Sequence, residues 1–213
     1  MSSTLLEGFG AGLVREMSLA ARVQAGLERL YGLDRVAAVA DYMQHATDGE
    51  REALLVRETD DGVEIALRVP MLRAREVPLE DASGLDPLCQ LIEGVSHFVL
   101  LTERARTEGS VSQLELELQA EVDKYVVLGS SLRDFDWQQS ARLRRRLYED
   151  IVYEHAAGSE RGERYRLANR VAAQYTHSLE RRYLHERRYG ELQHELRAFF
   201  HAPQGVKLQR VAA

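Results

Sequence analysis

Four ionisable side chains at helical spacing are the strongest candidates for chemistry in this sequence. Glu93 and His97 lie four residues apart, and so do Glu117 and Glu121. Side chains at that spacing sit one turn apart on the same face of an α-helix. Carboxylates and imidazole together suit Mn, Fe or Zn. If the two helices pack in antiparallel fashion, these residues predict a divalent metal site inside a helical bundle.

The position of Glu121 leaves a second interpretation open. Glu121 falls inside an apolar helical stripe with Leu114, Leu118 and Tyr125, which predicts that its carboxylate turns toward the interior. A buried carboxylate has to be neutralised by a cation, a metal or several hydrogen-bond donors. An arginine from the C-terminal helices would make this a structural ion pair, and His97 would then donate to a backbone carbonyl.

A second pair of residues lies nearer the C-terminus. Arg188 and His194 are separated by five residues in a segment expected to be helical. This spacing resembles the Arg-x4–6-His motif of HEPN ribonucleases, which are also helical. The resemblance implies that the arginine and the histidine act on an RNA phosphodiester at a dimer interface. It covers seven residues and departs from the family pattern at Tyr189, where a polar residue usually follows the arginine.

Two helices joined by a short turn are expected to position the first group, within residues 86–128. Asp86 has the character of an N-cap, and Pro87 suits the first helical position because its missing N–H costs nothing there. Ser112 and Glu115 have the spacing of a capping box and predict the start of the second helix.

The N-terminal third predicts helices followed by a small sheet. Residues 18–46 have the apolar spacing of two consecutive helices. Residues 63–69 alternate in polarity like a half-buried strand, with a weaker strand at 54–56 and a glycine-containing turn at 60–62. Because a lone hairpin is marginal in water, it must pack on helices, gain a third strand near 75–77 or pair with another subunit.

The C-terminal part predicts more helices. Residues 138–156 have an inward apolar stripe that includes Val152, and a long helix follows over about 163–201, interrupted at Gly190. Trp137, the only tryptophan, is expected to be a buried anchor for these helices.

The expected fold class is therefore α+β and mainly α. A small antiparallel β-hairpin or sheet near 52–78 accompanies a helical bundle from residue 87 onward. The expected organisation is an N-terminal part, 1–86, with helices and the hairpin, and a bundle, 87–213, packed together as one compact unit.

Composition narrows the class of protein. The chain has 213 residues, of which 45% are hydrophobic and 29% charged, a globular balance that argues against disorder. One cysteine, Cys89, excludes an internal disulfide framework. Neither a signal peptide nor a membrane-spanning run is visible, so a cytoplasmic location is expected. All but two of the 28 basic residues are arginine, which is typical of a GC-rich bacterial genome.

Charge is unevenly divided along the chain. Residues 1–137 carry a formal net charge of −12, whereas residues 138–213 carry +6. The simplest interpretation is that the basic C-terminal helices pack on the acidic half, and the alternative is a basic surface for an acidic partner or nucleic acid. The overall negative charge opposes phosphate binding. Four arginines, which intramolecular pairing would also explain, are the candidates for a local nucleic-acid contact: Arg142, Arg144, Arg145 and Arg146.

Three functions follow from these observations. The absence of a strong catalytic motif, the asymmetric charge and the expected free strand edge favour a bacterial scaffold or regulatory protein that acts through protein–protein contacts or self-association. The first alternative is a metal-dependent helical enzyme that uses Glu93, His97, Glu117 and Glu121 to activate water or oxygen. The second alternative is a ribonuclease that uses Arg188 and His194.

Overall fold

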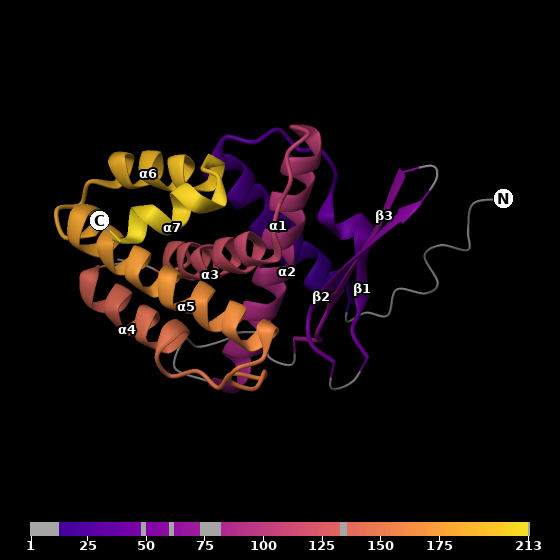
Figure 1. Ribbon diagram of the computed structural model, residues 1–213, viewed down its shortest axis with the longest axis horizontal. Coiled ribbons are helices and arrows are strands. Elements are labelled where there is room, and N and C mark those ends of the chain that lie inside the picture. The colour runs from indigo at the N-terminus through magenta and orange to yellow at the C-terminus, as the bar shows by residue number, and fades with distance from the viewer. Residues whose placement is uncertain (1–12, 48–49, 60–61, 73–81, 133–135, 213) are drawn as a thin grey trace.

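Helices make up most of the protein, and a small sheet lies at one side of them (Figure 1). The computed structural model describes residues 13–47, 50–59, 62–72, 82–132 and 136–212. Its helices are α1 (Leu13–Tyr31), α2 (Ala82–Arg106), α3 (Gln113–Ser130), α4 (Trp137–Tyr148), α5 (Glu160–Leu179), α6 (Tyr189–His201) and α7 (Gln204–Ala212). Its strands are β1 (Met43–His45), β2 (Ala53–Thr59) and β3 (Gly62–Val69). The α+β, mainly helical fold class expected from the sequence is confirmed.

Helix α3 lies at the centre of the helical part. It packs against α1, α2, α4 and α5, and its inward side chains include Leu118, Val122 and Tyr125. The sheet packs on α2 through β2 and β3, so α2 separates the sheet from α3 (Figure 1). Among the described helices, none has the length and apolarity that crossing a lipid bilayer requires.

The sheet has the strand order β1-β3-β2. Strands β2 and β3 pair in antiparallel fashion, with Val56 opposite Ile65, which confirms the expected hairpin. The third strand, β1, pairs in parallel with β3, so the sheet is mixed rather than purely antiparallel. The third strand expected near 75–77, and the two residues expected at the tip of the turn, 60–61, lie outside the described residues.

The prediction of a second helix within residues 18–46 is wrong. Helix α1 ends before Gly32, whose φ of +71° suits a helix C-terminus, as expected. A short 3-10 turn, Val39–Tyr42, and strand β1 then replace the second helix. Val39 and Met43 are buried, as the expected helix also required, because a short apolar run fits the period of a helix and the period of a strand. Pairing with the edge of β3 decides for the strand.

The helix boundaries around the centre follow the sequence in part. Ser112 caps α3 and accepts a hydrogen bond from the Glu115 backbone N–H at 3.0 Å, as expected. Asp86 is not an N-cap, because α2 begins at Ala82 and includes Pro87. The Asp86 carboxylate instead accepts a hydrogen bond from Gln90 one turn later, at 2.7 Å.

Several C-terminal expectations are wrong. Helix α4 ends at Tyr148, and Val152 is 98% exposed rather than inward-facing. Trp137 is 54% exposed, because it occupies the first turn of α4 while Ser140 and the residues on its face turn inward. The break in the long helix lies just before α6, where Arg187 has a φ of +55°.

Helix α7 is tied to α3 by a buried lysine. Lys207 is fully buried, and its Nζ donates to Glu115 Oε1 and to Gln119 Oε1, each at 3.1 Å. Gln119 in turn donates to Asp123, which also accepts from Ser96 at 2.6 Å. This polar chain connects α7, α3 and α2 inside the protein.

Candidate metal centre

The candidate centre forms where α2 packs against α3. Glu93 and His97 come from α2, and Glu117 comes from α3. One ligand atom of each residue, a carboxylate oxygen or a ring nitrogen, lies within 4.8 Å of the others. Lys124 lies opposite Glu93, and Glu117 lies opposite His97, so the order along α3 is reversed as antiparallel helices require. Three of the four residues proposed from the sequence therefore come together.

The imidazole of His97 lies between two carboxylates. Its Nε2 is 3.9 Å from Glu117 Oε2, and its Nδ1 is 3.6 Å from Glu52 Oε1. All three side chains are at most 10% exposed. Both distances are too long for direct hydrogen bonds. His97 Nε2 and Glu52 Oε1 accordingly have no hydrogen-bond partner among the described residues. The geometry therefore leaves a buried ring nitrogen and a buried carboxylate oxygen without a partner in the described residues, and the nitrogen can bind a ligand once the imidazole loses its proton.

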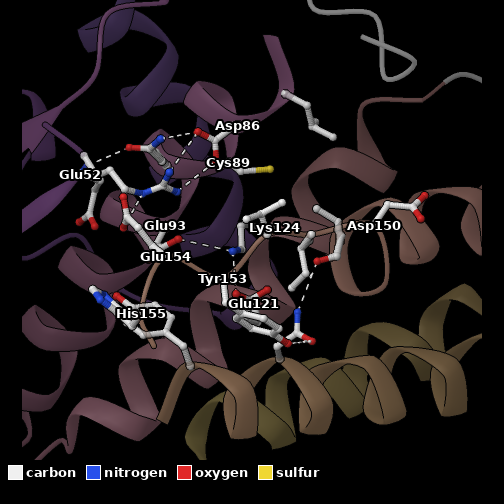
Figure 2. A pocket seen from close by; sticks show the side chains of 18 of the residues that line it. Glu52, Asp86, Cys89, Glu93, Glu121, Lys124, Asp150, Tyr153, Glu154 and His155 are labelled. Atoms are coloured by element: carbon white, nitrogen blue, oxygen red, sulfur yellow. Dashed lines mark hydrogen bonds and ion pairs between the residues drawn. The ribbon is translucent and has the colours of Figure 1, made fainter. Parts of the chain in front are cut away.

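Glu121 turns inward, but it belongs to a different pair. Its side chain is 12% exposed, and its Oε1 accepts a hydrogen bond from Lys124 Nζ at 2.8 Å. Lys124 Nζ also lies 3.4 Å from Glu93 Oε2 (Figure 2). Neither an arginine nor the group of three ligand candidates neutralises Glu121. A lysine three residues away on the same helix reaches it more directly than a side chain from another helix does.

A pocket opens beside this centre. Its volume is about 520 Å³, and it is bounded by α2, α3, the start of α5 and the segment between α4 and α5. Glu93, Glu121 and Lys124 of α2 and α3 line the pocket together with Tyr153 and His155 of the segment between α4 and α5 (Figure 2). The candidate centre is therefore largely buried, and Glu93 is the one of its three possible ligands that also lines the pocket.

An arginine bridges two walls of the pocket. Arg51 pairs with Asp86 of α2 at 3.1 Å and with Glu154 of the segment between α4 and α5 at 3.3 Å. All three side chains are about half exposed, so these ion pairs contribute little stability by themselves. They hold the segment between α4 and α5 close to Arg51, which directly precedes Glu52 in the chain.

Burial and neighbouring charges shift the pKa values of the acidic side chains. Burial raises the pKa of Glu52 and of Glu121, and it raises the pKa of Glu117 to about 7. Burial also disfavours ionised Glu93, but the charges of Lys124 and His97 outweigh it and hold the pKa of Glu93 below its usual value. The centre thus keeps one carboxylate firmly ionised among others that resist ionisation.

The imidazole responds in the opposite direction. Burial disfavours its charged form, but the surrounding carboxylates, led by Glu52, raise the pKa of His97 to about 9. Lys124 is held in its charged form by Glu121 and Glu93, which raise its pKa well above the usual value despite burial. The four carboxylates therefore face Lys124 and the protonated imidazole of His97, with Arg51 near Glu93 and Arg164 near Glu117. When His97 loses its proton, a bound cation can take over the balance of charge.

Glu52 and Lys124 were missed by reasoning from the sequence. Glu52 precedes β2, far along the chain from the residues that it meets. Gly94 lies opposite it on α2, and a Cβ at Gly94 would lie 2.9 Å from Glu52 Cγ. A glycine inside a helical pattern was the available signal for such a close approach.

The arginine and histidine of the possible ribonuclease motif lie apart from the pocket. Arg188 precedes α6 and contacts Glu191 and Glu186, while His194 is an exposed residue of α6. Neither residue of this pair lines the pocket.

Arg144 and Arg145 of α4 take part in intramolecular ion pairs. Arg144 contacts Glu180 at 3.1 Å, and Arg145 contacts Asp150 at 3.5 Å. Arg142 is exposed, and Arg146 lines the pocket.

In comparisons with known protein families, characterised proteins and solved structures, nothing matches this chain. The function must therefore be inferred from its own side chains.

Proposed function

We propose that the protein is a metal-dependent enzyme that binds one divalent transition-metal ion through Glu93, His97 and Glu117. The observation that carries this proposal is the buried Nε2 of His97, which lacks a hydrogen-bond partner in the described part of the chain and lies 3.9 Å from Glu117 Oε2, within a group of three possible ligands. A buried polar atom without a partner is unfavourable unless a ligand satisfies it.

The charge of the centre supports a dication. Glu52, Glu93, Glu117 and Glu121 gather around Lys124 and the imidazole of His97, with Arg51 near Glu93 and Arg164 near Glu117. A divalent ion would replace the proton on His97 and the proton that burial favours on Glu117, so metal binding would release protons.

The donor set favours Mn, Fe or Zn over Mg or Ca. One imidazole nitrogen with two carboxylates suits first-row transition metals, whereas Mg and Ca prefer oxygen ligands alone. Three protein ligands leave coordination positions open for water or substrate, as in catalytic rather than structural sites. The chemistry that such an ion supplies is the activation of bound water or of a substrate oxygen.

The pocket provides the space for a substrate. A volume of about 520 Å³ falls in the range typical of small-molecule sites. Glu93 belongs to both the ligand group and the pocket wall, so a metal held by Glu93 would face the bound molecule. Lys124 sits between Glu93 and Glu121, where it occupies the position that a second metal would need.

Metal analysis tests this proposal directly. Protein purified without chelators should contain close to one equivalent of Mn, Fe or Zn, and the chelator-treated protein should bind Zn²⁺ in calorimetry. His97→Gln and Glu117→Gln should each remove this binding. Glu154→Gln, which alters an exposed carboxylate on the pocket wall, is the matched control and should retain it. A wild-type protein without metal and without measurable Zn²⁺ binding would refute the proposal.

A strand edge that no other described strand covers favours a second candidate function, protein–protein contact. Strand β2 lies at the edge of the sheet, and its Leu55 and Val56 are 41% and 48% exposed. An extended segment of a partner, or β2 of a second copy, could add to this edge.

The second candidate is tested by mass in solution. If β2 mediates self-association, Val56→Lys should reduce the mass measured by light scattering at high protein concentration. Val14→Lys, at an exposed valine of α1, is the control. A monomer whose mass Val56→Lys does not change, and whose β2 amides exchange freely with solvent in cell extract, would count against it.

A further inference from the structure

We infer that Glu52 is a positioning residue that holds His97 as the Nδ1–H tautomer and so directs its Nε2 lone pair toward the metal. This inference rests on the proposed metal site and adds a residue that does not belong to its ligand group. A carboxylate that accepts from the far ring nitrogen is the usual partner of a metal-binding histidine, and it fixes both the tautomer and the ring orientation.

The two ring nitrogens face different carboxylates. Nδ1 lies 3.6 Å from Glu52 Oε1, whereas Nε2 lies 3.9 Å from Glu117 Oε2. Neutral imidazole has one N–H and one lone pair, so only one of the two nitrogens can bind a metal. The ligand atoms that converge within 4.8 Å come from Glu93, His97 and Glu117 and do not include Glu52. The proton therefore belongs on Nδ1, toward Glu52.

Three residues on one face of helix α2 contact Glu52 and hold it in place. The Glu52 backbone N–H donates to Gln90 Oε1 at 2.9 Å. Gly94, one turn later, leaves room for the Glu52 side chain: a Cβ there would lie 2.9 Å from Cγ and 3.0 Å from Oε1. His97 follows after three more residues. Residues at positions 90, 94 and 97 share one helix face, so one face both fixes Glu52 and receives its carboxylate.

The burial of Glu52 gives the contact its strength. The Glu52 side chain is 7% exposed and that of His97 is 9% exposed, so water competes little for either group. Glu52 Oε1 has no other hydrogen-bond partner among the residues described. A small shift of the imidazole, such as metal binding would produce, is enough to close the 3.6 Å separation to a hydrogen bond.

Two readouts test this role. The first is the tautomer of His97 in metal-free protein, read from its ¹⁵N ring shifts at a pH above the end of its own measured titration. Wild type should show the Nδ1–H form, Glu52→Ala should lose that preference, and Glu52→Gln should keep it because the amide oxygen also accepts from Nδ1–H. The second is Zn²⁺ affinity, measured by chelator competition. Glu52→Ala should weaken it about 10- to 100-fold, with partial recovery in Glu52→Gln.

The two readouts separate this inference from the proposed function. If wild type shows the Nδ1–H form and Glu52→Ala loses it, but neither binds Zn²⁺, Glu52 positions the ring and the metal proposal fails. If wild type binds Zn²⁺ and Glu52→Ala changes neither the tautomer nor the affinity, the positioning role is wrong. Glu154→Gln is the control for both readouts, and circular dichroism verifies that each variant is folded.

Discussion

Adding one methyl group at Gly94 should destabilise the protein, although the same change usually stabilises a helix. An ideal Cβ at Gly94 would lie 2.6 Å from Leu67 Cδ1 and 2.9 Å from Glu52 Cγ. Both distances are far below van der Waals contact. Leu67 is fully buried in β3, so it cannot move without disturbing the contact between the sheet and α2.

The magnitude follows from two opposing effects. Gly→Ala in a helix interior gains about 1 kcal/mol from helix propensity. Overpacking of a well-packed core costs about 1–3 kcal/mol. For Gly94→Ala the second effect exceeds the first, and we expect the free energy of unfolding to fall by about 1 kcal/mol. Gly26→Ala in α1 is the matched control, because nothing lies within 4 Å of a Cβ there, and it should stabilise by about 0.5–1 kcal/mol.

Urea unfolding of both variants measures the difference, provided that the slope of the transition stays constant. The corresponding shift in Tm is roughly 2–4 °C per kcal/mol for a chain of this length. Gly94→Ala should also weaken Zn²⁺ binding, because it displaces Glu52, whereas Gly26→Ala should leave binding unchanged. If Gly94→Ala proves as stable as Gly26→Ala, then Leu67 and Glu52 yield easily, and the reasoning about this close approach is wrong.

Three further predictions concern buried charge. Lys124→Met should destabilise the protein by about 3–5 kcal/mol, because it leaves Glu93 and Glu121 buried without their cation; adding Glu121→Gln should restore part of this loss in a double-mutant cycle, and strict additivity would contradict the pairing. Titration of chelator-treated protein should saturate at one metal per chain, since Lys124 blocks a second position; two equivalents in mass spectrometry under native conditions would overturn that count. Burial lowers the pKa of Lys207 to about 8, so between about pH 8 and pH 10.5 the unfolded state binds more protons than the folded state. The free energy of unfolding of wild type relative to Lys207→Met should therefore rise with pH by up to about 3 kcal/mol across this range. A flat difference in urea unfolding would show that Lys207 stays charged in the folded protein.

Local signals in the sequence predicted local structure well. The cap at Ser112 and the end of α1 at Gly32 depend on residues a few positions away, and both are confirmed. Strand β1 was missed because it exists only through pairing with β3, more than twenty residues later. Its apolar spacing fits a helix equally well, so no local feature distinguishes the two.

In the candidate site too, contacts set by local spacing were predicted, and contacts between distant parts of the chain were not. Helical spacing brought Glu93, His97 and Glu117 onto facing surfaces of α2 and α3, because packing of sequential helices follows from their apolar stripes. The contact between Glu52 and His97 depends on where the sheet packs on α2, which no spacing encodes. The partner of Glu121 was expected to be an arginine or a metal, but it is Lys124 of the same helix.

The lysine on α7 has a consequence for how the chain acquires its structure during translation. Glu115 and Gln119 of α3 leave the ribosome well before Lys207, so α3 must wait for its buried cation until the chain has emerged as far as Lys207. Until then Glu115 has Arg104 as its only cationic contact in the described part of the chain. The nascent bundle should therefore remain open and protease-sensitive until α7 docks, and closure should come late and in a single cooperative step.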